Sequence, residues 1–315
     1  MSPRCCISIF HPASCILYSL PVHFCKITVV GVGLLGGSLG LAIKRRKLAR
    51  HVAGYVRRAA SVAECEKAGA VDLATLDLGR AVAGADLVIL CTPLLQMRVL
   101  VKQMLPMLKP GAILTDVGSV KSSVVKEIEA MARKAGAHFV GSHPMAGSEK
   151  TGVSASRADL FVDAACVVTP TKRTNRAALR KIEQFWKAVG GRVLRMTPEL
   201  HDALAGRSSH LPHMTAVALA NVVLDPRNPR HQAALCANGF RDTTRIASCS
   251  PEMWRDIALA NRRNLARSLG ELIRELEKFR GALSRPDAKA IAGMLERAKQ
   301  RRDSWSARCA SSSPE

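Results

Sequence analysis

The sequence is short of aromatic residues and of paired cysteines, and each shortage narrows the class of protein. Only 4% of its 315 residues are aromatic while 48% are hydrophobic, so aliphatic side chains must fill the core. The ten cysteines include no Cys-x-x-Cys pair, which argues against a zinc site and is typical of a reducing, cytoplasmic protein. No hydrophobic run reaches the roughly 18 residues that cross a membrane, so we expect no membrane insertion.

Acidic residues are also scarce, at 25 against 47 basic residues, which gives a formal net charge of +22. Such a balance suits nucleic acid, an anionic surface or an acidic small molecule. The basic residues are spread along the chain without a block of five or more. We therefore expect no nucleic-acid partner and consider a phosphate-bearing ligand instead.

Residues 1–25 differ in character from the rest of the chain. They are apolar with a single arginine, like a weak signal peptide, but proline and histidine interrupt the run. No small-x-small cleavage site precedes Lys26. We interpret them as a disordered extension or as the result of a start codon assigned too early, with Val22 as a possible GTG start.

From Lys26 onward, short β-branched runs alternate with helical patterns. Alternation of this kind predicts parallel strands joined by right-handed crossovers, and hence a doubly wound, mainly parallel α/β sheet over residues 26–196. Residues 197–303 carry only helical patterns and predict an all-helical second domain, followed by a polar tail at 304–315. The expected strands are 26–31, 51–56, 85–93, 112–117, 138–144, 164–170 and 192–196.

A GxGxxG sequence, Gly31-Val32-Gly33-Leu34-Leu35-Gly36, follows the first expected strand and opens a helix. In this context Gly31 permits a tight turn, Gly33 lets the backbone approach a pyrophosphate, and Gly36 lets helix and strand pack closely. The alternative is a glycine turn without a ligand. We predict a dinucleotide site that includes Leu35 and, from the Cys-Thr-Pro turn after a later strand, Thr92 and Pro93.

The end of the second expected strand indicates which dinucleotide binds. An acidic residue there usually binds the ribose 2′-hydroxyl of NAD, but this chain has Arg57 and Arg58 and no acid before Glu64. Arginine forks suit a 2′-phosphate, whereas the alternative makes both arginines solvated surface residues. The sequence favours NADP over NAD.

Several candidate site residues can be interpreted either as structural or as functional, and the sequence around them does not decide between the two. Ser119, between a strand and a helix, is either an N-cap or a catalytic hydroxyl. His143 is a loop histidine or a general base, and Arg245 a surface ion-pair partner or a carboxylate anchor. His210 and His213 have metal-like spacing, but no third ligand is apparent, so we predict no metal.

Six motifs occur together and in order: GVGLLGGSLG, CTP, DVGSVK, SHPMAGSEKTG, SHLPH and GFRDTTRIA. In this combination the chain resembles the prephenate dehydrogenase and arogenate dehydrogenase family of tyrosine biosynthesis, from about Lys26 to about Lys299. The resemblance implies a homodimer formed through the helical domain. It also implies hydride transfer to a nicotinamide from the ring carbon that bears the 4-hydroxyl, with loss of CO2.

The resemblance also implies roles for individual residues. His143 matches the family's catalytic histidine and Ser119 its serine partner, while Arg245, His213 and Glu149 match substrate-binding positions. A neutral imidazole suits proton abstraction near neutral pH, and a bidentate arginine suits a dicarboxylate such as prephenate. His213 and Glu149 favour prephenate over arogenate without excluding the latter.

Two rival functions also fit part of the sequence. The β-hydroxyacid dehydrogenases share the glycine-rich fold and a helical second domain, but their lysine-bearing glycine-rich helix has no counterpart after residue 170. A non-enzymatic NADP-binding regulator belongs to a different class. Nicotinamide absorbance on mixing protein, NADP and prephenate separates these rivals from the dehydrogenase.

Overall fold

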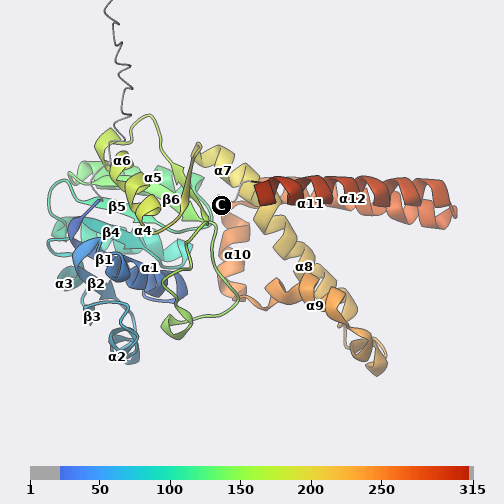
Figure 1. Ribbon diagram of the computed structural model, residues 1–315, viewed down its shortest axis with the longest axis horizontal. Helices are drawn as coiled ribbons and strands as arrows, with labels where there is room; N and C mark the ends of the chain where they lie inside the picture. The colour runs from blue at the N-terminus through green and yellow to red at the C-terminus, as the bar shows by residue number, and fades with distance from the viewer. Residues whose placement is uncertain (1–21, 312–315) are drawn as a thin grey trace, which may run out of the picture.

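The computed structural model describes residues 22–311, which form a sheet-containing lobe and a helical arm (Figure 1). The sheet has eight strands in the order β3-β2-β1-β4-β5-β6-β7-β8. The strands β1 to β6 are all parallel, as the alternation of strands and helices predicts. Their bounds are β1 Phe24–Val30, β2 Ala49–Tyr55, β3 Leu73–Thr75, β4 Leu87–Leu90, β5 Ile113–Asp116, β6 His138–Pro144, β7 Ala165–Thr169 and β8 Arg192–Arg195.

Helices cover both faces of the sheet, so side chains on both sides of each central strand are buried. In β4, for example, Leu87 and Ile89 join the core on one face, whereas Val88 and Leu90 join the core on the other. Helices α1 and α6 pack on the first face and α4 and α5 on the second. The helices of this lobe are α1 Leu34–Arg45, α2 Ala60–Lys67, α3 Leu78–Val82, α4 Leu94–Met104, η1 Leu105–Met107, α5 Ser122–Lys134, η2 Val153–Ala155 and α6 Arg176–Ala188.

The expectation of parallel pairing is wrong for one pair of strands, because β7 runs antiparallel to β6. A parallel partner needs a connection that crosses the sheet, usually through a helix. The segment 145–164 instead stays near the start of α1, where Ser156 Oγ donates to the carbonyl oxygens of Gly33 and Leu34. The chain therefore enters β7 from the edge at which β6 ended, and its direction reverses.

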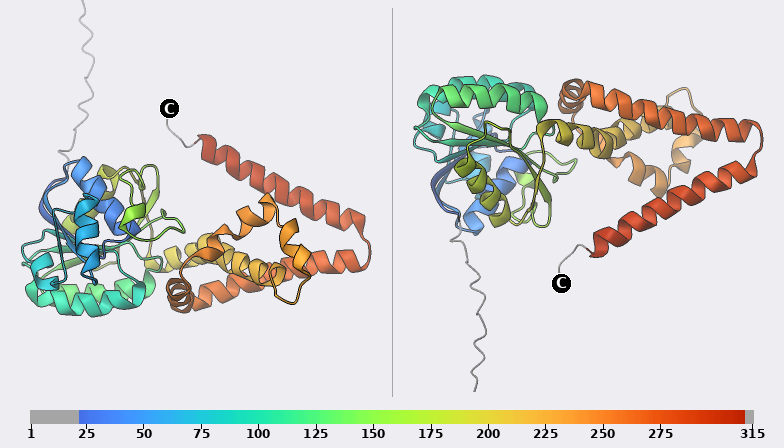
Figure 2. Two further views of the ribbon diagram at one scale, coloured as in Figure 1. Left: turned by 90° about the horizontal axis from the view of Figure 1, so that it is seen from below. Right: turned by 90° about the horizontal axis from the view of Figure 1, so that it is seen from above.

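The arm contains only helices, and its two longest members, α11 and α12, diverge from the turn at 285–287 as a V-shaped pair (Figure 2). One turn of π-helix, η3, lies between α7 and α8. It precedes Pro212, which lacks the N–H that a regular helix needs at that point. The arm comprises α7 Pro198–Ala205, η3 Gly206–His210, α8 Leu211–Val223, η4 Arg230–Leu235, α9 Asn238–Thr244, η5 Arg245–Ser248, α10 Pro251–Ala260, α11 Arg262–Ser284 and α12 Ala288–Ser311.

The expected boundaries need two changes. Strand β1 begins at Phe24, so the last residues assigned to the N-terminal extension belong to the sheet, and residues 1–21 lie outside the described part of the chain. Helix α12 continues to Ser311 instead of giving way to a polar tail at residue 304.

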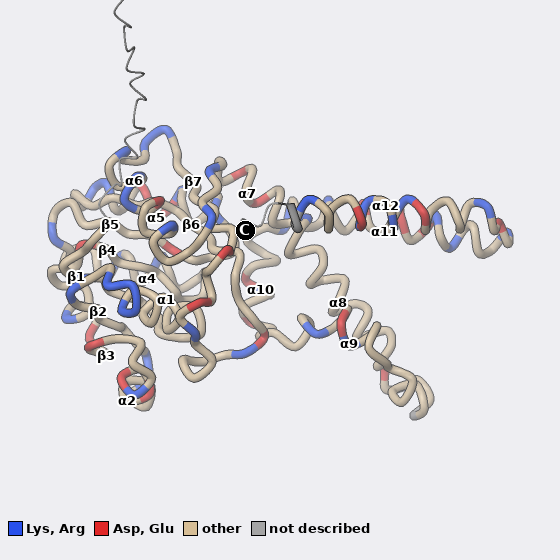
Figure 3. Tube along the Cα trace, viewed as in Figure 1, with Lys and Arg blue, Asp and Glu red and all other residues tan. Residues whose placement is uncertain are grey.

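Lys and Arg are spread over the sheet lobe and the helical arm (Figure 3). Among residues 22–311, no helix is both long enough and apolar enough to traverse a bilayer.

Candidate active site

The glycine-rich turn between β1 and α1 has the geometry that its spacing predicts. Gly31 has a φ of +96°, and a Cβ there would lie 2.7 Å from the carbonyl oxygen of Cys91. A Cβ at Gly36 would overlap the carbonyl oxygen of Gly31, which explains why α1 needs glycine where it passes β1. A Cβ at Gly33 would meet nothing within 4 Å. The backbone at Gly33 is thus open to the approach of a ligand.

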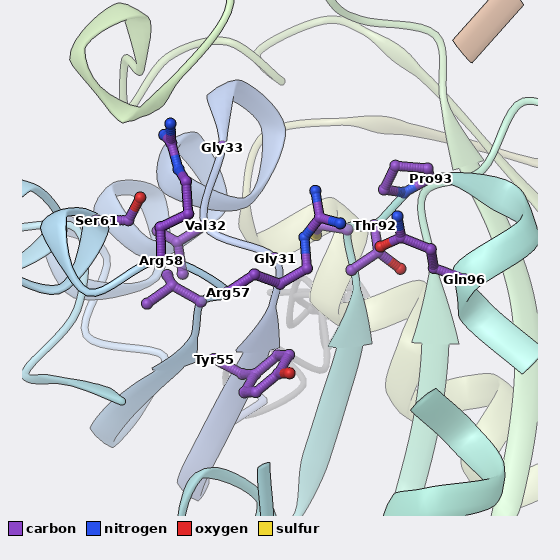
Figure 4. Close-up of a pocket in the computed structure, with 12 residues that line it drawn as sticks. Gly31, Val32, Gly33, Tyr55, Arg57, Arg58, Ser61, Thr92, Pro93 and Gln96 are labelled. Atoms are coloured by element: carbon purple, nitrogen blue, oxygen red, sulfur yellow. The ribbon is translucent and has the colours of Figure 1, made fainter. Parts of the chain in front are cut away.

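A cavity lies beside this turn, and Figure 4 shows the side chains around it. Arg57 extends toward Thr92 and Gln96, whereas Arg58 lies on the same side of the cavity as Ser61 (Figure 4). Of the predicted cofactor residues, Leu35 and Gly36 do not line the cavity. Leu35 is half-buried and packs against the core, and Gly36 is buried where α1 passes β1. The lining residues are Gly31, Val32, Gly33, Tyr55, Val56, Arg57, Arg58, Ser61, Cys91, Thr92, Pro93 and Gln96.

The lining of this cavity fits a phosphorylated dinucleotide. The open backbone at Gly33 is also the N-cap of the 12-residue helix α1, and no side chain caps that helix. Uncapped N–H groups at a helix N-terminus attract a pyrophosphate. Arg57 and Arg58, which follow the end of β2, add positive charge to the lining of the cavity.

His143 lies at the carboxyl end of β6, the edge of the parallel sheet at which the glycine turn also lies. Its backbone pairs with Val167 of β7, and its side chain is buried, with only 7% of the residue exposed. Burial holds the pKa of His143 well below 6.5, and the neighbouring His201 and Lys121 lower it further. The imidazole is therefore neutral at physiological pH, the state that a general base requires.

Two residues that the sequence did not single out form a hydrogen-bonded chain with His143. His201 of α7 approaches it to 2.8 Å between His201 Nε2 and His143 Nδ1, and Asp202 lies 2.8 Å from the other nitrogen of His201. Asp202 also accepts the backbone N–H groups of Lys121 and Ser122 at the start of α5. In the sequence, His201 and Asp202 are only an adjacent histidine and aspartate near the start of a helix. Nothing in that pattern indicates a contact with His143.

Lys121 is a third residue that the sequence did not identify. Its side chain is fully buried, forms an ion pair with Asp116 and donates to the carbonyl oxygen of Ser142 at 2.8 Å. Burial lowers the pKa of Lys121, and Asp116 opposes that shift. The lysine fixes the end of β5 against the residue that precedes His143.

Ser119 does not cap a helix, because α5 begins three residues later at Ser122 and its first N–H groups bind Asp202. The serine is half-buried, and its hydroxyl makes no hydrogen bond with residues in the 22–311 range. The capping interpretation is wrong, and the catalytic interpretation stays a prediction.

The predicted substrate residues fall into two groups. Arg245, at the start of η5, forms an ion pair with Glu149, with 2.6 Å between Nη1 and Oε2, although 96 residues separate them. His213 is buried and stacks on Trp254, with 3.4 Å between ring centroids, and burial lowers its pKa. The buried His210 is held by Asn261 at 3.1 Å. No group of three or more potential metal ligands occurs in the described part of the chain.

Together these features define a class of protein. A doubly wound sheet with a glycine turn, a phosphate-compatible cavity and a neutral buried imidazole at one edge belongs to a dinucleotide-dependent dehydrogenase. A family model described as "Prephenate dehydrogenase, nucleotide-binding domain" matches residues 39–195, and one described as "Prephenate dehydrogenase, dimerization domain" matches residues 197–297. The chain belongs to the prephenate dehydrogenase family.

Individual relatives agree with the family match. The chain is 34% identical to a prephenate dehydrogenase of Bacillus subtilis, over 88% of this chain and 75% of the relative. A crystal structure of prephenate dehydrogenase from A. aeolicus with hydroxyphenyl propionate and NAD+ superposes with a TM-score of 0.83 at 32% identity, covering 91% of this chain and 99% of that one. Synechocystis arogenate dehydrogenase has a TM-score of 0.74 at 30% identity, covering 89% and 99%. The family match decides against the β-hydroxyacid alternative.

Proposed function

We propose that the protein is a prephenate dehydrogenase, which converts prephenate to 4-hydroxyphenylpyruvate and CO2 in tyrosine biosynthesis. The observation that carries this proposal is the buried, neutral His143 at the sheet edge that also holds the dinucleotide-compatible cavity. Membership of the family and likeness to the B. subtilis and A. aeolicus proteins support prephenate as the substrate.

In this proposal His143 accepts the proton of the substrate 4-hydroxyl while the carbon that bears it loses hydride. The nicotinamide dinucleotide, when bound, accepts that hydride. Ser119 hydrogen-bonds the same hydroxyl oxygen and orients it toward His143. The ring then becomes aromatic as CO2 leaves, and its oxygen takes a proton back from His143 to form the phenol hydroxyl of the product. The residues of the chain therefore need only position the substrate and move one proton.

Substrate binding is assigned to Arg245, His213 and Glu149. The exposed guanidinium of Arg245 is available to a carboxylate because its present partner, Glu149, is itself only partly buried. An exposed ion pair contributes about 0–1 kcal/mol, so a substrate carboxylate can replace Glu149 at little cost. His213 of α8, held by its stack on Trp254, offers an imidazole.

The cofactor is proposed to be NADP rather than NAD. Arg58 and Ser61 flank one side of the cavity, where a 2′-phosphate would find a guanidinium and a hydroxyl. We expect Arg58→Ala to lower kcat/KM for NADP by at least about tenfold, which corresponds to losing about 1.4 kcal/mol, with little change for NAD. Arg50→Ala, an exposed arginine at the start of β2, is the matched control. Equal losses with both cofactors would contradict a 2′-phosphate role.

The proposed working form is a cytoplasmic homodimer that assembles through the helical arm. Support comes from the family description of residues 197–297 as a dimerization domain and from the apolar side chains that α11 and α12 expose. No nucleic acid or membrane takes part in this proposal.

The direct test is a set of four steady-state assays that combine prephenate or arogenate with NAD or NADP. We expect the highest kcat/KM with prephenate and NADP, measured as nicotinamide absorbance. Preference for arogenate would support the alternative that the likeness to the Synechocystis enzyme suggests. Failure to reduce either dinucleotide with either substrate would contradict the proposed function and leave a non-enzymatic NADP-binding regulator.

A further inference from the structure

A chain of three buried side chains runs from the helical arm to the proposed base. His143 Nδ1 lies 2.8 Å from His201 Nε2, and His201 Nδ1 lies 2.8 Å from Asp202 Oδ1. The two imidazole rings meet edge to face, with 5.1 Å between centroids and 72° between planes. All three residues are at least nine-tenths buried. Water therefore does not compete for these hydrogen bonds.

Asp202 anchors the chain as a carboxylate. Burial alone would raise the pKa of Asp202, but the hydrogen bonds from His201 and from the backbone of Lys121 and Ser122 outweigh burial, and the pKa is lowered. The backbone N–H groups lie 2.7 and 2.9 Å from its two oxygens, at the positive end of the 13-residue helix α5. An ionised carboxylate only accepts hydrogen bonds, so His201 Nδ1 must carry a hydrogen.

That requirement sets the hydrogen positions along the rest of the chain. A neutral imidazole has one N–H, so His201 with hydrogen on Nδ1 presents a bare Nε2. The bond between His201 and His143 then requires the hydrogen on His143 Nδ1. His143 Nε2 is left bare, and it makes no hydrogen bond with residues 22–311. A bare nitrogen with no protein partner is the atom that can accept a proton from a substrate.

We propose that His201 and Asp202 are positioning residues for the base, which hold His143 in the tautomer with hydrogen on Nδ1 and balance the proton that it gains. The proposal rests on the proposed function. In the proton transfer, the substrate O–H bond breaks and an N–H bond forms at His143 Nε2. The electron pair of the O–H bond becomes the second bond of a carbonyl as hydride leaves the same carbon for the dinucleotide. The imidazolium so formed donates to His201, and the charge of Asp202 stabilises the pair.

The same pair connects the base to the docking of the helical arm. His201 and Asp202 lie in α7, whose N-cap Thr197 accepts the N–H of Leu200. Asn261, between α10 and α11, donates to the backbone carbonyl of Asp202 at 2.8 Å. Asp202 in turn holds the first turn of α5 in the sheet lobe. The base therefore has its required tautomer only while the arm is docked against α5.

Two substitutions of similar size separate this role from a merely structural one. His201→Gln keeps an acceptor for His143 and a donor for Asp202, whereas His201→Leu keeps neither. We expect kcat to fall at least about 100-fold in His201→Leu and by less than about tenfold in His201→Gln, because a general base contributes about 10²–10⁴. Dinucleotide affinity and Tm serve as checks of folding, and His231→Gln, at an exposed histidine, is the control.

A second measurement does not depend on turnover. In ¹⁵N–¹H correlation spectra of the whole protein labelled at histidine, the proposal requires His143 to carry its hydrogen on Nδ1 at pH 7. Hydrogen on Nε2 of His143, or His201→Leu with the kcat of the wild type, would overturn the positioning role. A wild-type protein that oxidises neither substrate would instead overturn the proposed function, and the spectra would still test the tautomer.

Discussion

At the scale of single residues, buried imidazoles dominate the site. Burial lowers the pKa of His143 and His213 below 6.5 and that of His210 to about 4. Neutral histidines suit a reaction that removes a proton, and they avoid the cost of charge in a dry interior. The same arrangement makes both activity and stability sensitive to acid.

The first prediction concerns this sensitivity. Between pH 6.5 and about 4 the unfolded chain binds a proton at residue 210 and the folded chain does not, so the free energy of unfolding falls as the pH falls. For His210 alone we expect a loss of about 2 kcal/mol between pH 7 and pH 5, at about 1.36 kcal/mol per pKa unit. Urea denaturation at the two pH values measures it. His210→Gln should reduce the measured difference by about 2 kcal/mol, leaving the part that His143 and His213 contribute. An unchanged difference would contradict the assignment.

At the scale of elements, the glycine turn illustrates how much local sequence can determine. The spacing of Gly31, Gly33 and Gly36 predicted the turn, the helix start and the close packing, because each depends on residues that are neighbours in sequence. The strand at 138–144 was predicted with the bounds that it has. Local patterns sufficed here because one strand or turn contains all of the information.

Features that depend on distant segments were not predictable in this way. His201 lies 58 residues from its partner His143, and only the docking of α7 brings them together. The reversal at β7 depends on the path of the segment 145–164 near α1, which no periodicity records. The ion pair between Glu149 and Arg245 likewise needs the arm to fold back toward the sheet lobe.

The second prediction concerns two glycines of this turn. Gly33→Ala should fold with an unchanged Tm but bind the dinucleotide at least about tenfold more weakly, because its methyl group enters the open side of the turn. Gly36→Ala should lower the Tm, because its methyl group meets the backbone of Gly31. Thermal unfolding and dinucleotide titration of both variants check this. Full affinity in Gly33→Ala would show that the pyrophosphate binds elsewhere.

At the scale of the whole molecule, the helical arm projects from the sheet lobe and exposes apolar side chains (Figure 1). Leu276 and Leu283 of α11 are 58% and 65% exposed and lie seven residues apart, on one face of the helix. Leu295 of α12 is 58% exposed. Exposed apolar surface of this kind marks an interface.

The third prediction is that the chain sediments as a dimer and that Leu276→Glu with Leu283→Glu converts it to a monomer of 33.9 kDa. Burying two carboxylates in an apolar interface costs several kcal/mol, which is enough to dissociate a dimer at micromolar concentration. Leu76→Glu, at an exposed leucine of the sheet lobe, is the control and should stay dimeric. A monomeric wild-type protein would contradict this assignment.

The most direct test of the account is the turnover of His143→Asn with prephenate and NADP, measured beside its dinucleotide affinity. Asparagine retains a polar side chain of similar size but cannot accept the proton. The account predicts that kcat falls by about 10²–10⁴ while the Tm is unchanged and dinucleotide affinity stays within a factor of a few of the wild type. A His143→Asn variant with near-normal kcat would contradict the claim that His143 is the base.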